Sequence, residues 1–399
     1  MKRNLWIFSP LAKPSFYLES EGKQWYFRWG NFDWILLIAA IFLMVLGSMT
    51  ILSTVLSPDV KIAESQLFIS HLFNIAISLG FFLIFLRLDY RIFKHFSVLM
   101  YLSAILLLIF VLVLGHTTRG SMRWIDLGFF RFQPSEMAKI LLTCSLASYF
   151  SSLKEKINDF RYILLSLVLT LIPTILVIAE PDLGTGMVLI AIWIGMLILS
   201  GARLRYLALF FLGGLLTLPL VWFFILVPYQ KDRILAFLNP KTDPLGSGYA
   251  VIQSIIAVGS GKLLGRGWGR GTQSHLQFLP ERSTDFIFAS LAEELGFLGI
   301  SILLLSYGFF LIRILKIVKN AADSFGSFIG IGFFMMFIFQ IVVNIGMNLG
   351  IMPITGIPLP LVSYGGTSLA TCFIALGILE SIALHQSTSS GMKIDSEEI

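Results

Sequence analysis

Long apolar runs, separated by shorter polar segments, dominate the chain after about residue 33. An α-helix needs about 20 apolar residues to cross the roughly 30 Å of bilayer hydrocarbon. Ten runs reach or approach this length, the fourth and sixth being short: 34–54, 66–86, 96–115, 136–152, 160–179, 183–200, 206–227, 286–312, 325–349 and 360–384. The pattern predicts an all-α polytopic membrane protein with about ten transmembrane helices.

Composition agrees with this prediction. Of the 399 residues, 56% are hydrophobic and 13% are charged, which is more apolar surface than a soluble domain can bury. The net charge is +6, and in a membrane protein basicity usually reflects loops near anionic lipid rather than nucleic-acid binding. We therefore expect membrane lipids, and no nucleic acid, among its partners. Two cysteines in apolar runs and five scattered histidines indicate neither a disulfide framework nor a zinc site.

The distribution of Lys and Arg predicts the orientation. Seventeen of the 29 lie on the side of the N-terminus, about five lie in or beside the short segments of the other side, and seven lie in the long loop 228–285. Positive charge favours the cytoplasm, and long loops count little. Residues 1–32 are thus expected to be a retained cytoplasmic arm, 33–385 a ten-span membrane domain and 386–399 a cytoplasmic tail.

The stretch 278–289 changes from a polar loop to a long apolar run at Asp285. A carboxylate at this boundary can face water from a low-dielectric wall, where its pKa can be tuned and it can serve a substrate at the membrane surface. The alternative is that Asp285, or Thr284 beside it, caps the N-terminus of the following helix. Both interpretations can hold together.

Charged residues inside spans cost about 2.5–3.5 kcal/mol each at mid-bilayer, so they need partners or functions. Glu136 and Lys139 are three residues apart on one helix face and can pair. Their pair either locks helix packing or orients Lys139 toward an anionic headgroup. Asp182 precedes a helix start, where N-capping is favoured and contact with a cation or substrate is the alternative.

Deeper in the eighth run, Glu293 and Glu294 lie about two turns after Asp285. Helix geometry lets at most one of them share a cavity with Asp285, and we favour Glu293. The glycine- and proline-rich segment 350–368 predicts irregular backbone around a polar cavity near Asn344 and Asn348, because such backbone is tolerated in membranes only where it is buried in protein or lines a cavity.

The loop 228–285 is too long for a simple turn. Its residues 249–258 are apolar at helical spacing and are expected to form an interfacial or re-entrant helix. The glycine-rich residues 259–271 lack the glycine and Ser/Thr positions of a phosphate loop. They remain either a flexible solvated loop or a backbone that approaches a ligand.

Several polar and glycine-rich blocks extend over most of the chain after about residue 117. They are Arg123-Trp124-Ile125, Phe132–Lys139, Pro181–Thr185, Phe237–Pro240 with Asp243-Pro244, Gly271–Ser274, Phe278–Phe297, Asn344–Met347 and Ser363–Gly366. Together they resemble the SEDS family (shape, elongation, division and sporulation). Gln133-Pro134-Ser135 and the block around Pro240 resemble its RodA branch more than its FtsW branch.

The resemblance implies a ten-span peptidoglycan glycosyltransferase of a bacterial cytoplasmic (inner) membrane. Such an enzyme polymerises lipid II on the outer side for wall elongation and rod shape, with a class B penicillin-binding protein cross-linking the product. The essential acidic residue of the family falls on Asp285. Two departures occur: Ser283 stands where the family often has His, and Glu180 where it often has Gln or Lys.

Glycan growth requires a sugar hydroxyl to attack an anomeric carbon while a lipid pyrophosphate leaves, which needs a base and positive charge. Asp285 is the expected base. The expected substrate-binding residues are Arg123, Lys139 and Arg233 at the pyrophosphate, Glu136 holding Lys139, and Trp124, Asp182, Glu281, Ser363 and Tyr364 nearby. A divalent cation, Mg²⁺ or Mn²⁺, is compatible with two phosphates, although no ligand set is readable.

Two other functions fit the same physics. A flippase or transporter of a lipid-linked precursor would also need ten spans, a polar cavity and buried charge, but we see no internal repeat typical of transporters. A scaffold that only holds the cross-linking partner would be insensitive to charge changes on the outer face. Glycan chains and free lipid pyrophosphate formed by purified protein in detergent would distinguish the enzyme.

Overall fold

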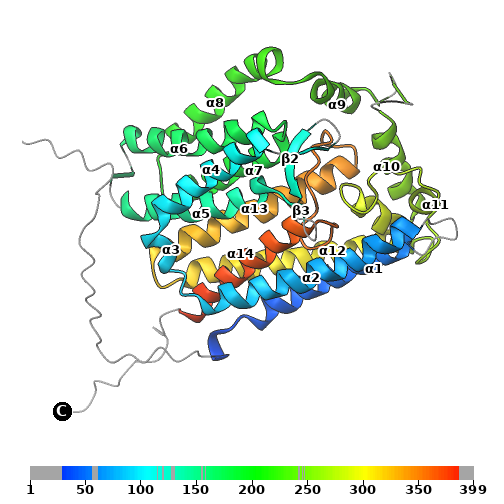
Figure 1. Cartoon of the computed structure of the whole chain (residues 1–399), viewed down its shortest axis with the longest axis horizontal. Helices are drawn as coiled ribbons and strands as arrows, with labels where there is room; N and C mark the ends of the chain where they lie inside the picture. The colour runs from blue at the N-terminus through cyan, green and yellow to red at the C-terminus, as the bar shows by residue number, and fades with distance from the viewer. Residues whose placement is uncertain are drawn as a thin grey trace, which may run out of the picture.

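The computed structural model is a bundle of long helices with a small sheet and three shorter helices at one end (Figure 1). It describes residues 29–385 except 56–61, 115, 119–120, 127–130, 154–155, 158, 241–242, 245 and 247. All statements about the structure refer to this part of the chain.

Each predicted span coincides with one long helix. These are α1 (Trp34–Val55), α2 (Ile62–Arg87), α4 (Ser97–Leu114), α5 (Pro134–Leu153), α6 (Phe160–Ala179), α7 (Leu183–Leu199), α8 (Leu204–Leu220), α12 (Ile287–Asn320), α13 (Ser324–Asn348) and α14 (Gly366–Leu384). Six of them, α1, α2, α6, α12, α13 and α14, are long and apolar enough to cross a membrane, while α4, α7 and α8 contain shorter apolar stretches. Short elements η1 (Trp29–Asn31) and α3 (Ile92–His95) and a π-helical turn at Val221–Ile225 complete the bundle. The predicted all-α polytopic membrane fold is confirmed.

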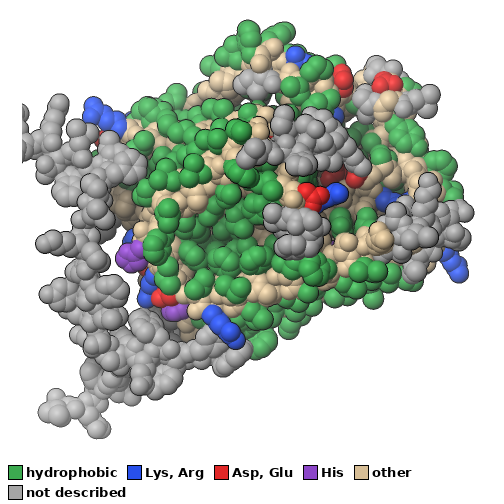
Figure 2. Space-filling view, viewed as in Figure 1, with side chains coloured by type: hydrophobic (Ala, Val, Ile, Leu, Met, Phe, Trp, Pro, Cys, Tyr) green, Lys and Arg blue, Asp and Glu red, His purple; other side chains and the backbone are tan. Residues whose placement is uncertain are grey.

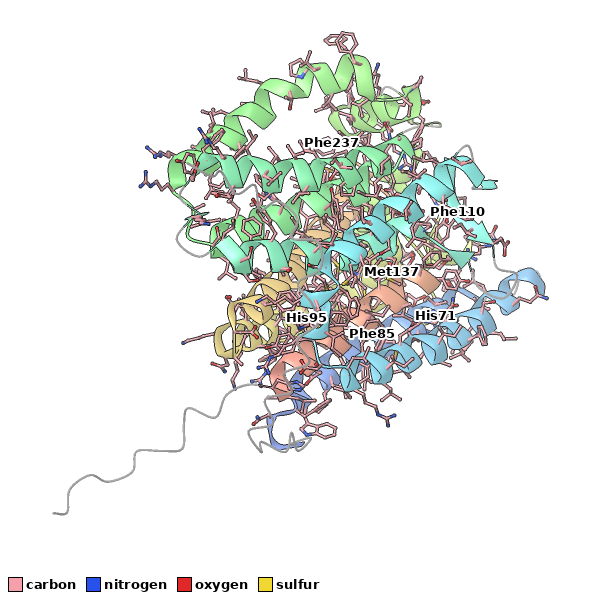
Figure 3. All side chains as sticks on the ribbon, turned by 60° about the vertical axis from the view of Figure 1, so that its left-hand side comes forward. His71, Phe85, His95, Phe110, Met137 and Phe237 are labelled. Atoms are coloured by element: carbon pink, nitrogen blue, oxygen red, sulfur yellow. The ribbon has the colours of Figure 1, made fainter. Side chains whose placement is uncertain are left out.

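The interior is built around α14, whose apolar window is 89% buried, and which packs against α2, α5 and α13. The outward faces of the other helices expose large hydrophobic side chains, as on α4, α8 and α12. Figure 2 shows hydrophobic side chains over the middle of one face and charged ones toward its two ends, and Figure 3 shows the carbon-rich side chains of the helices, Phe85, Phe110 and Met137 among them. Such an apolar belt needs lipid around it.

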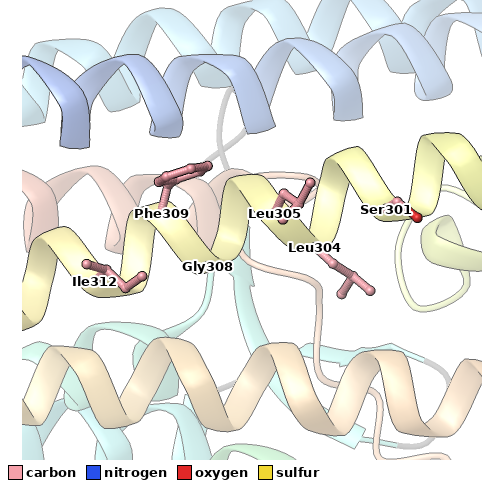
Figure 4. Close-up of a pocket in the computed structure, with 6 residues that line it drawn as sticks. All are labelled: Ser301, Leu304, Leu305, Gly308, Phe309 and Ile312. Carbon is pink, nitrogen blue, oxygen red and sulfur yellow. The ribbon is translucent and has the colours of Figure 1, made fainter.

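One part of this belt is hollowed on α12. An open groove there is lined by Ser301, Leu304, Leu305, Gly308, Phe309 and Ile312 (Figure 4). The Ser301 hydroxyl donates a hydrogen bond to the carbonyl of Phe297 within the helix. The groove therefore offers apolar contact and shape, and not the polar groups that glycosyl transfer needs.

The two ends of the described chain meet at one end of the bundle. Asp33, just before α1, forms an ion pair with Arg313 on α12, with 2.6 Å between Oδ2 and Nη2. The backbone N–H of Asp33 donates to Oε2 of Glu380 on α14 at 3.0 Å. This meeting is what an even number of spans requires.

At the opposite end, residues expected to form only a loop fold into a three-stranded antiparallel sheet (Figure 1). Its strands are β1 (His116–Thr118), β2 (Ser121–Asp126) and β3 (Arg131–Phe132). The hydroxyl of Thr367 on α14 donates to the carbonyl of Arg131 at 2.7 Å and accepts from the N–H of Gln133 at 3.1 Å. Because this anchor comes from more than 230 residues away, the local pattern did not predict the sheet.

The long loop 228–285 contains α9 (Pro228–Leu238), α10 (Tyr249–Ser260) and α11 (Thr272–His275). The predicted helix over 249–258 is confirmed as α10, which packs on α12 and α13 with one face buried. On that face the Ser254 hydroxyl donates to the carbonyl of Asn348 at 2.8 Å. The polar hydroxyl thus serves to dock α10 on the bundle.

The eighth span is interrupted at Gly296, whose φ of +65° breaks α12 into two helical parts. Two carbonyls before the break accept from the N–H groups of Arg266 and Gly267, both at 3.0 Å. After it, the N–H groups of Phe297 and Leu298 donate to the loop at 2.8 and 3.1 Å. The glycine-rich segment 259–271 is therefore not a solvated loop there: it supplies the hydrogen bonds that a broken membrane helix must recover.

Candidate active site

Asp285 lies in a tight turn immediately before α12. The carbonyl of Glu281, a residue with a left-handed φ of +48°, accepts from the N–H groups of Thr284 and Phe286 at 3.1 and 3.2 Å. The side-chain amides of Asn344 and Asn348, both on α13, donate to the carbonyl of Asp285 at 3.1 and 3.0 Å. The backbone that carries the half-buried carboxylate is thus held from two directions.

The alternative role of Asp285 or Thr284 as N-cap is wrong. Phe286 occupies the cap position and makes no side-chain cap bond. The N–H of Ala289, three residues further on, donates instead to Oδ1 of Asn348 at 3.1 Å. Because α13 performs the capping, the carboxylate of Asp285 is not required for it.

The segment after α13 supports the same turn, as its glycine- and proline-rich composition predicts. The Ser363 hydroxyl donates to the carbonyl of Thr284 at 2.6 Å, and the N–H of Tyr364 donates to the carbonyl of Ser283 at 2.8 Å. The Tyr364 ring lies 5.9 Å from that of His71 on α2, a histidine labelled in Figure 3. Ser363 and Tyr364, predicted to bind substrate, therefore position the Asp285 segment in this structure.

Asp285 and Arg233 meet across Gly356. A Cβ atom placed on Gly356 would lie 3.7 Å from Oδ2 of Asp285 and 3.8 Å from Nη1 of Arg233. Arg233 comes from α9, where its guanidinium also lies 5.6 Å from the centre of the Tyr229 ring. The predicted acidic residue and one predicted cation thus border the same small gap, and both are half-buried.

A second predicted cation, Arg123 on β2, stabilises a neighbouring turn. Its Nε donates to the carbonyl of Glu180 at 2.9 Å, and its Nη2 donates to that of Pro181. The Tyr229 hydroxyl donates to the same Pro181 carbonyl at 2.8 Å, as does the side chain of Gln230 at 3.1 Å. Arg123 is therefore a structural clamp between the sheet, α9 and the turn before α7.

The predicted N-cap role of Asp182 is confirmed. Its Oδ1 accepts from the N–H of Thr185 at 3.2 Å and its Oδ2 accepts from the Thr185 hydroxyl at 3.0 Å. Gln133 also donates to Oδ2 at 3.2 Å. Both carboxylate oxygens accept hydrogen bonds and only 5% of the residue is exposed, so Asp182 has a structural role at the start of α7.

Glu180, one of the two departures from the family pattern, is fully buried. Neither carboxyl oxygen has a hydrogen-bond partner among the described residues. Burial raises the pKa of Glu180 to about 9, and the negative charge of Asp182 adds to the shift while Arg123 opposes it. The carboxyl is therefore protonated at neutral pH.

Lys139, the third expected cation, has no atom within 4 Å of the Cβ position on Gly356 where Asp285 and Arg233 meet. Its Nζ lies 2.7 Å from Oε1 of Glu136, and the two side chains are 1% and 3% exposed. The pair therefore lies inside the bundle. The structure supports the internal ion pair, which was one of the two alternatives, and the contact of Lys139 with a lipid headgroup stays a prediction.

Glu293, favoured as a neighbour of Asp285, serves α11 instead. Its carboxylate accepts from the N–H groups of Gln273 and Ser274 at 2.9 and 3.1 Å and from the Ser274 hydroxyl at 3.0 Å. Glu294 accepts from the hydroxyl of Ser53 on α1 at 2.5 Å. Both acids therefore fix the glycine-rich segment against α1 and α12.

The remaining predicted residues lie at the border of this region. Trp124 is half-buried on β2, and Glu281 is exposed with its Oε2 accepting from the Thr284 hydroxyl at 3.3 Å. Within the described ranges, no group of three or more His, Cys, Asp and Glu side chains could hold a metal ion. Gln230, Asn344 and Asn348 were not predicted as site residues, although the two asparagines were noted beside the expected cavity.

The family profile that matches the chain is that of the FtsW, RodA and SpoVE cell cycle proteins, and it covers residues 33–388. The peptidoglycan glycosyltransferase MrdB of Escherichia coli K12 is 42% identical over 319 residues, which are 78% of this chain and 84% of that protein. The peptidoglycan glycosyltransferase RodA of Treponema pallidum is 34% identical over 429 residues, covering 89% and 98%.

Solved structures agree. A chain of a peptidoglycan synthase complex, described as coordinating polymerization and crosslinking, is 32% identical and matches with a TM-score of 0.76 over 90% of this chain and 100% of that one. The rod shape determining protein RodA of Thermus thermophilus is 27% identical, with a TM-score of 0.66 over 89% and 97%. The chain belongs to the FtsW/RodA/SpoVE family, as its SEDS motifs predicted.

Proposed function

We propose that this protein is a peptidoglycan glycosyltransferase that polymerises lipid II into glycan strands for cell-wall elongation. The observation that carries the proposal is the gap at Gly356, bordered by a carboxylate and a guanidinium on a rigidly held backbone. The names of relatives at 34–42% identity support the same activity. The surrounding apolar belt would keep a lipid-linked substrate in the bilayer beside the site.

In this mechanism, Asp285 accepts the proton of the attacking sugar hydroxyl. The hydroxyl oxygen forms a bond to the anomeric carbon, and the bond from that carbon to the pyrophosphate oxygen breaks with the electron pair leaving on the lipid pyrophosphate. Arg233, across the gap, stabilises the negative charge that develops there. Since protein and substrate are both aligned by the membrane, proximity contributes to the rate.

A divalent cation fits this proposal only as a partner of the pyrophosphate. Mg²⁺ is commonly held by one or two carboxylates together with substrate phosphates and water. Asp285 is the side chain in the gap that would serve it, and the cation would add charge neutralisation there. The described residues form no protein-only set of ligands.

The site end of the bundle would face the outside of a bacterial cytoplasmic membrane, with both termini in the cytoplasm. The excess of Lys and Arg on the other side supports this orientation. A class B penicillin-binding protein is the proposed partner, supported by the similarity to a chain of a complex that couples polymerization to crosslinking. It would cross-link strands close to where they emerge.

The test is Asp285→Asn in purified protein supplied with lipid II in detergent. Native protein is expected to form glycan chains and free lipid pyrophosphate, and the variant to lose on the order of 10²–10⁴-fold in rate, the contribution of a positioned base. Since α13 caps α12, the thermal unfolding midpoint should stay near the native value. Near-native polymerisation by the variant would remove Asp285 from the mechanism. Lipid II translocation by native protein in liposomes without polymerisation would favour the flippase.

A further inference from the structure

Gly356 has two separate reasons to be glycine. Its φ is +75°, in the left-handed region that disfavours a side chain. In addition, apart from its chain neighbours, the described atoms within 4 Å of an added Cβ are Oδ2 of Asp285 and Nη1 of Arg233. A methyl group there would fit against the protein at ordinary contact distances and would occupy the gap between the two charged groups.

The backbone on both sides of Gly356 is anchored, so it cannot retreat from an added side chain. The carbonyl of Ile357 accepts from the Asn344 side chain at 2.8 Å. A Cβ added to Gly184, at the start of α7, would lie 2.7 Å from a side-chain carbon of Ile357 and 3.0 Å from the carbonyl oxygen of Thr355. The segment 355–357 is thus pressed against α7 and tied to α13.

We propose that Gly356 is the floor of the substrate gap, a residue that determines which ligand fits by having no side chain. This inference rests on the proposed function and deepens it. The sugar carbon that is attacked and the first phosphate of the leaving group would lie over its Cα. Asp285 would be on the side of the incoming hydroxyl and Arg233 on the side of the phosphate.

The gap is too short for two independent sites. Both charged atoms lie within 4 Å of one point, so a single group placed there touches both. A sugar–phosphate junction has the matching polarity: a hydroxyl that loses a proton at one end and an anionic leaving group at the other. A side chain at Gly356 would hold this junction away from both residues at once.

Gly201 offers a matched control. It lies between α7 and α8, at the end of the bundle away from Asp285, and its φ is +74°. An added Cβ meets nothing within 4 Å there. Gly201→Ala therefore carries the same left-handed backbone cost as Gly356→Ala, about 1 kcal/mol, without filling the gap.

The experiment compares native protein, Gly201→Ala, Gly356→Ala and Gly356→Asn for thermal unfolding and for lipid II polymerisation over a range of lipid II concentrations. Asparagine tolerates the left-handed region best but is larger than alanine. We expect the two alanine variants to lose similar thermal stability. Only the Gly356 variants should lose polymerisation, with kcat/KM at least tenfold lower for alanine and lower again for asparagine, and with KM raised.

Two results would overturn the inference. One is native kcat/KM in Gly356→Ala. The other is an asparagine variant more active than the alanine variant, because backbone strain alone would then explain the effect. If Gly356→Ala does not fold while Gly356→Asn does, the asparagine variant is the test: a reduced kcat/KM supports the inference, and a native kcat/KM overturns it. Failure of native protein to polymerise lipid II would instead refute the proposed function.

Discussion

The chain places acid–base pairs in two contrasting settings. Glu136 and Lys139 are adjacent on one helix, almost completely buried and bonded to each other. Asp285 and Arg233 come from different elements, are half-buried and border a gap at a glycine. The first pair is closed inside the bundle, whereas the second borders the space in which we propose that substrate binds.

The backbone contacts sharpen this difference. The carbonyl of Asp285 accepts from two side-chain amides of α13, so these hydrogen bonds position the main chain that carries the carboxylate. For Lys139, the side chain itself is the structural contact. The Glu136–Lys139 pair is therefore a structural contact between side chains, whereas the fold positions Asp285 through its backbone beside the proposed substrate gap.

The largest effect on stability is expected from breaking the buried Glu136–Lys139 pair. Lys139→Met should destabilise the protein by about 3–5 kcal/mol, because it leaves the carboxylate of Glu136 buried without its cation. The double variant Glu136→Gln/Lys139→Met should recover most of this loss, since no charge remains. Thermal unfolding in detergent at one fixed heating rate measures both.

If the single variant is as stable as native protein, the pair is not buried in solution, and the contrast between the two settings fails. Recovery in the double variant without recovery of polymerisation would show that Lys139 also contributes to the reaction.

A smaller, purely kinetic effect is expected at the other pair. Arg233→Ala should reduce kcat/KM for lipid II about 10–100-fold, because a cation at the leaving group is lost. Its thermal stability should change little. Arg123→Ala is the matched comparison: it removes the clamp on the Pro181 carbonyl and should lower the unfolding midpoint.

Polymerisation assays and unfolding curves of both arginine variants test whether Arg233 acts on the reaction and Arg123 on stability. Equal loss of stability in the two would contradict it, as would native activity in Arg233→Ala.

A further effect should be visible only as a pH dependence. The pKa of Glu180 is about 9 in the folded protein against an ordinary value near 4.5, so folding takes up a proton between these values. The stability contributed by this group is complete below about pH 4.5 and is lost as the pH rises to about 9. Glu180→Gln has no such loss.

The unfolding midpoint of Glu180→Gln relative to native protein should therefore rise between pH 5 and pH 8, by several degrees. Gln133→Ala, which removes one donor from Asp182 nearby, is the control and should show no comparable trend. A difference between Glu180→Gln and native protein that is constant with pH would show that the carboxyl is ionised in the folded state.

Much of the architecture could be predicted because its determinants are local. Each apolar run became a helix, α10 was expected from its spacing, and Asp182 capped α7 through a residue three positions away. The motifs that predicted the family were also contiguous. These features depend on residues a few positions away in the chain, which can be read directly from the sequence.

The parts that could not be predicted depend on distant partners. Asn348 caps α12 from 59 residues away, so Asp285 and Thr284 looked like caps when they were not. Arg123 was predicted as a pyrophosphate contact, whereas its hydrogen bond to the carbonyl of Pro181, 58 residues later, could not be predicted. The role of the glycines of 259–271 could not be predicted, because it depends on their close backbone contact with the break in α12 at Gly296.

The sequence by itself determined that this is a membrane helical bundle with an acidic residue at a helix boundary, because hydropathy is a property of short windows. The tertiary structure alone decided which charged side chains come together. The physical reason is that a polar group near the bilayer must find its partner by packing. That partner is set by how helices lie together, and in this chain it is often more than 50 residues away.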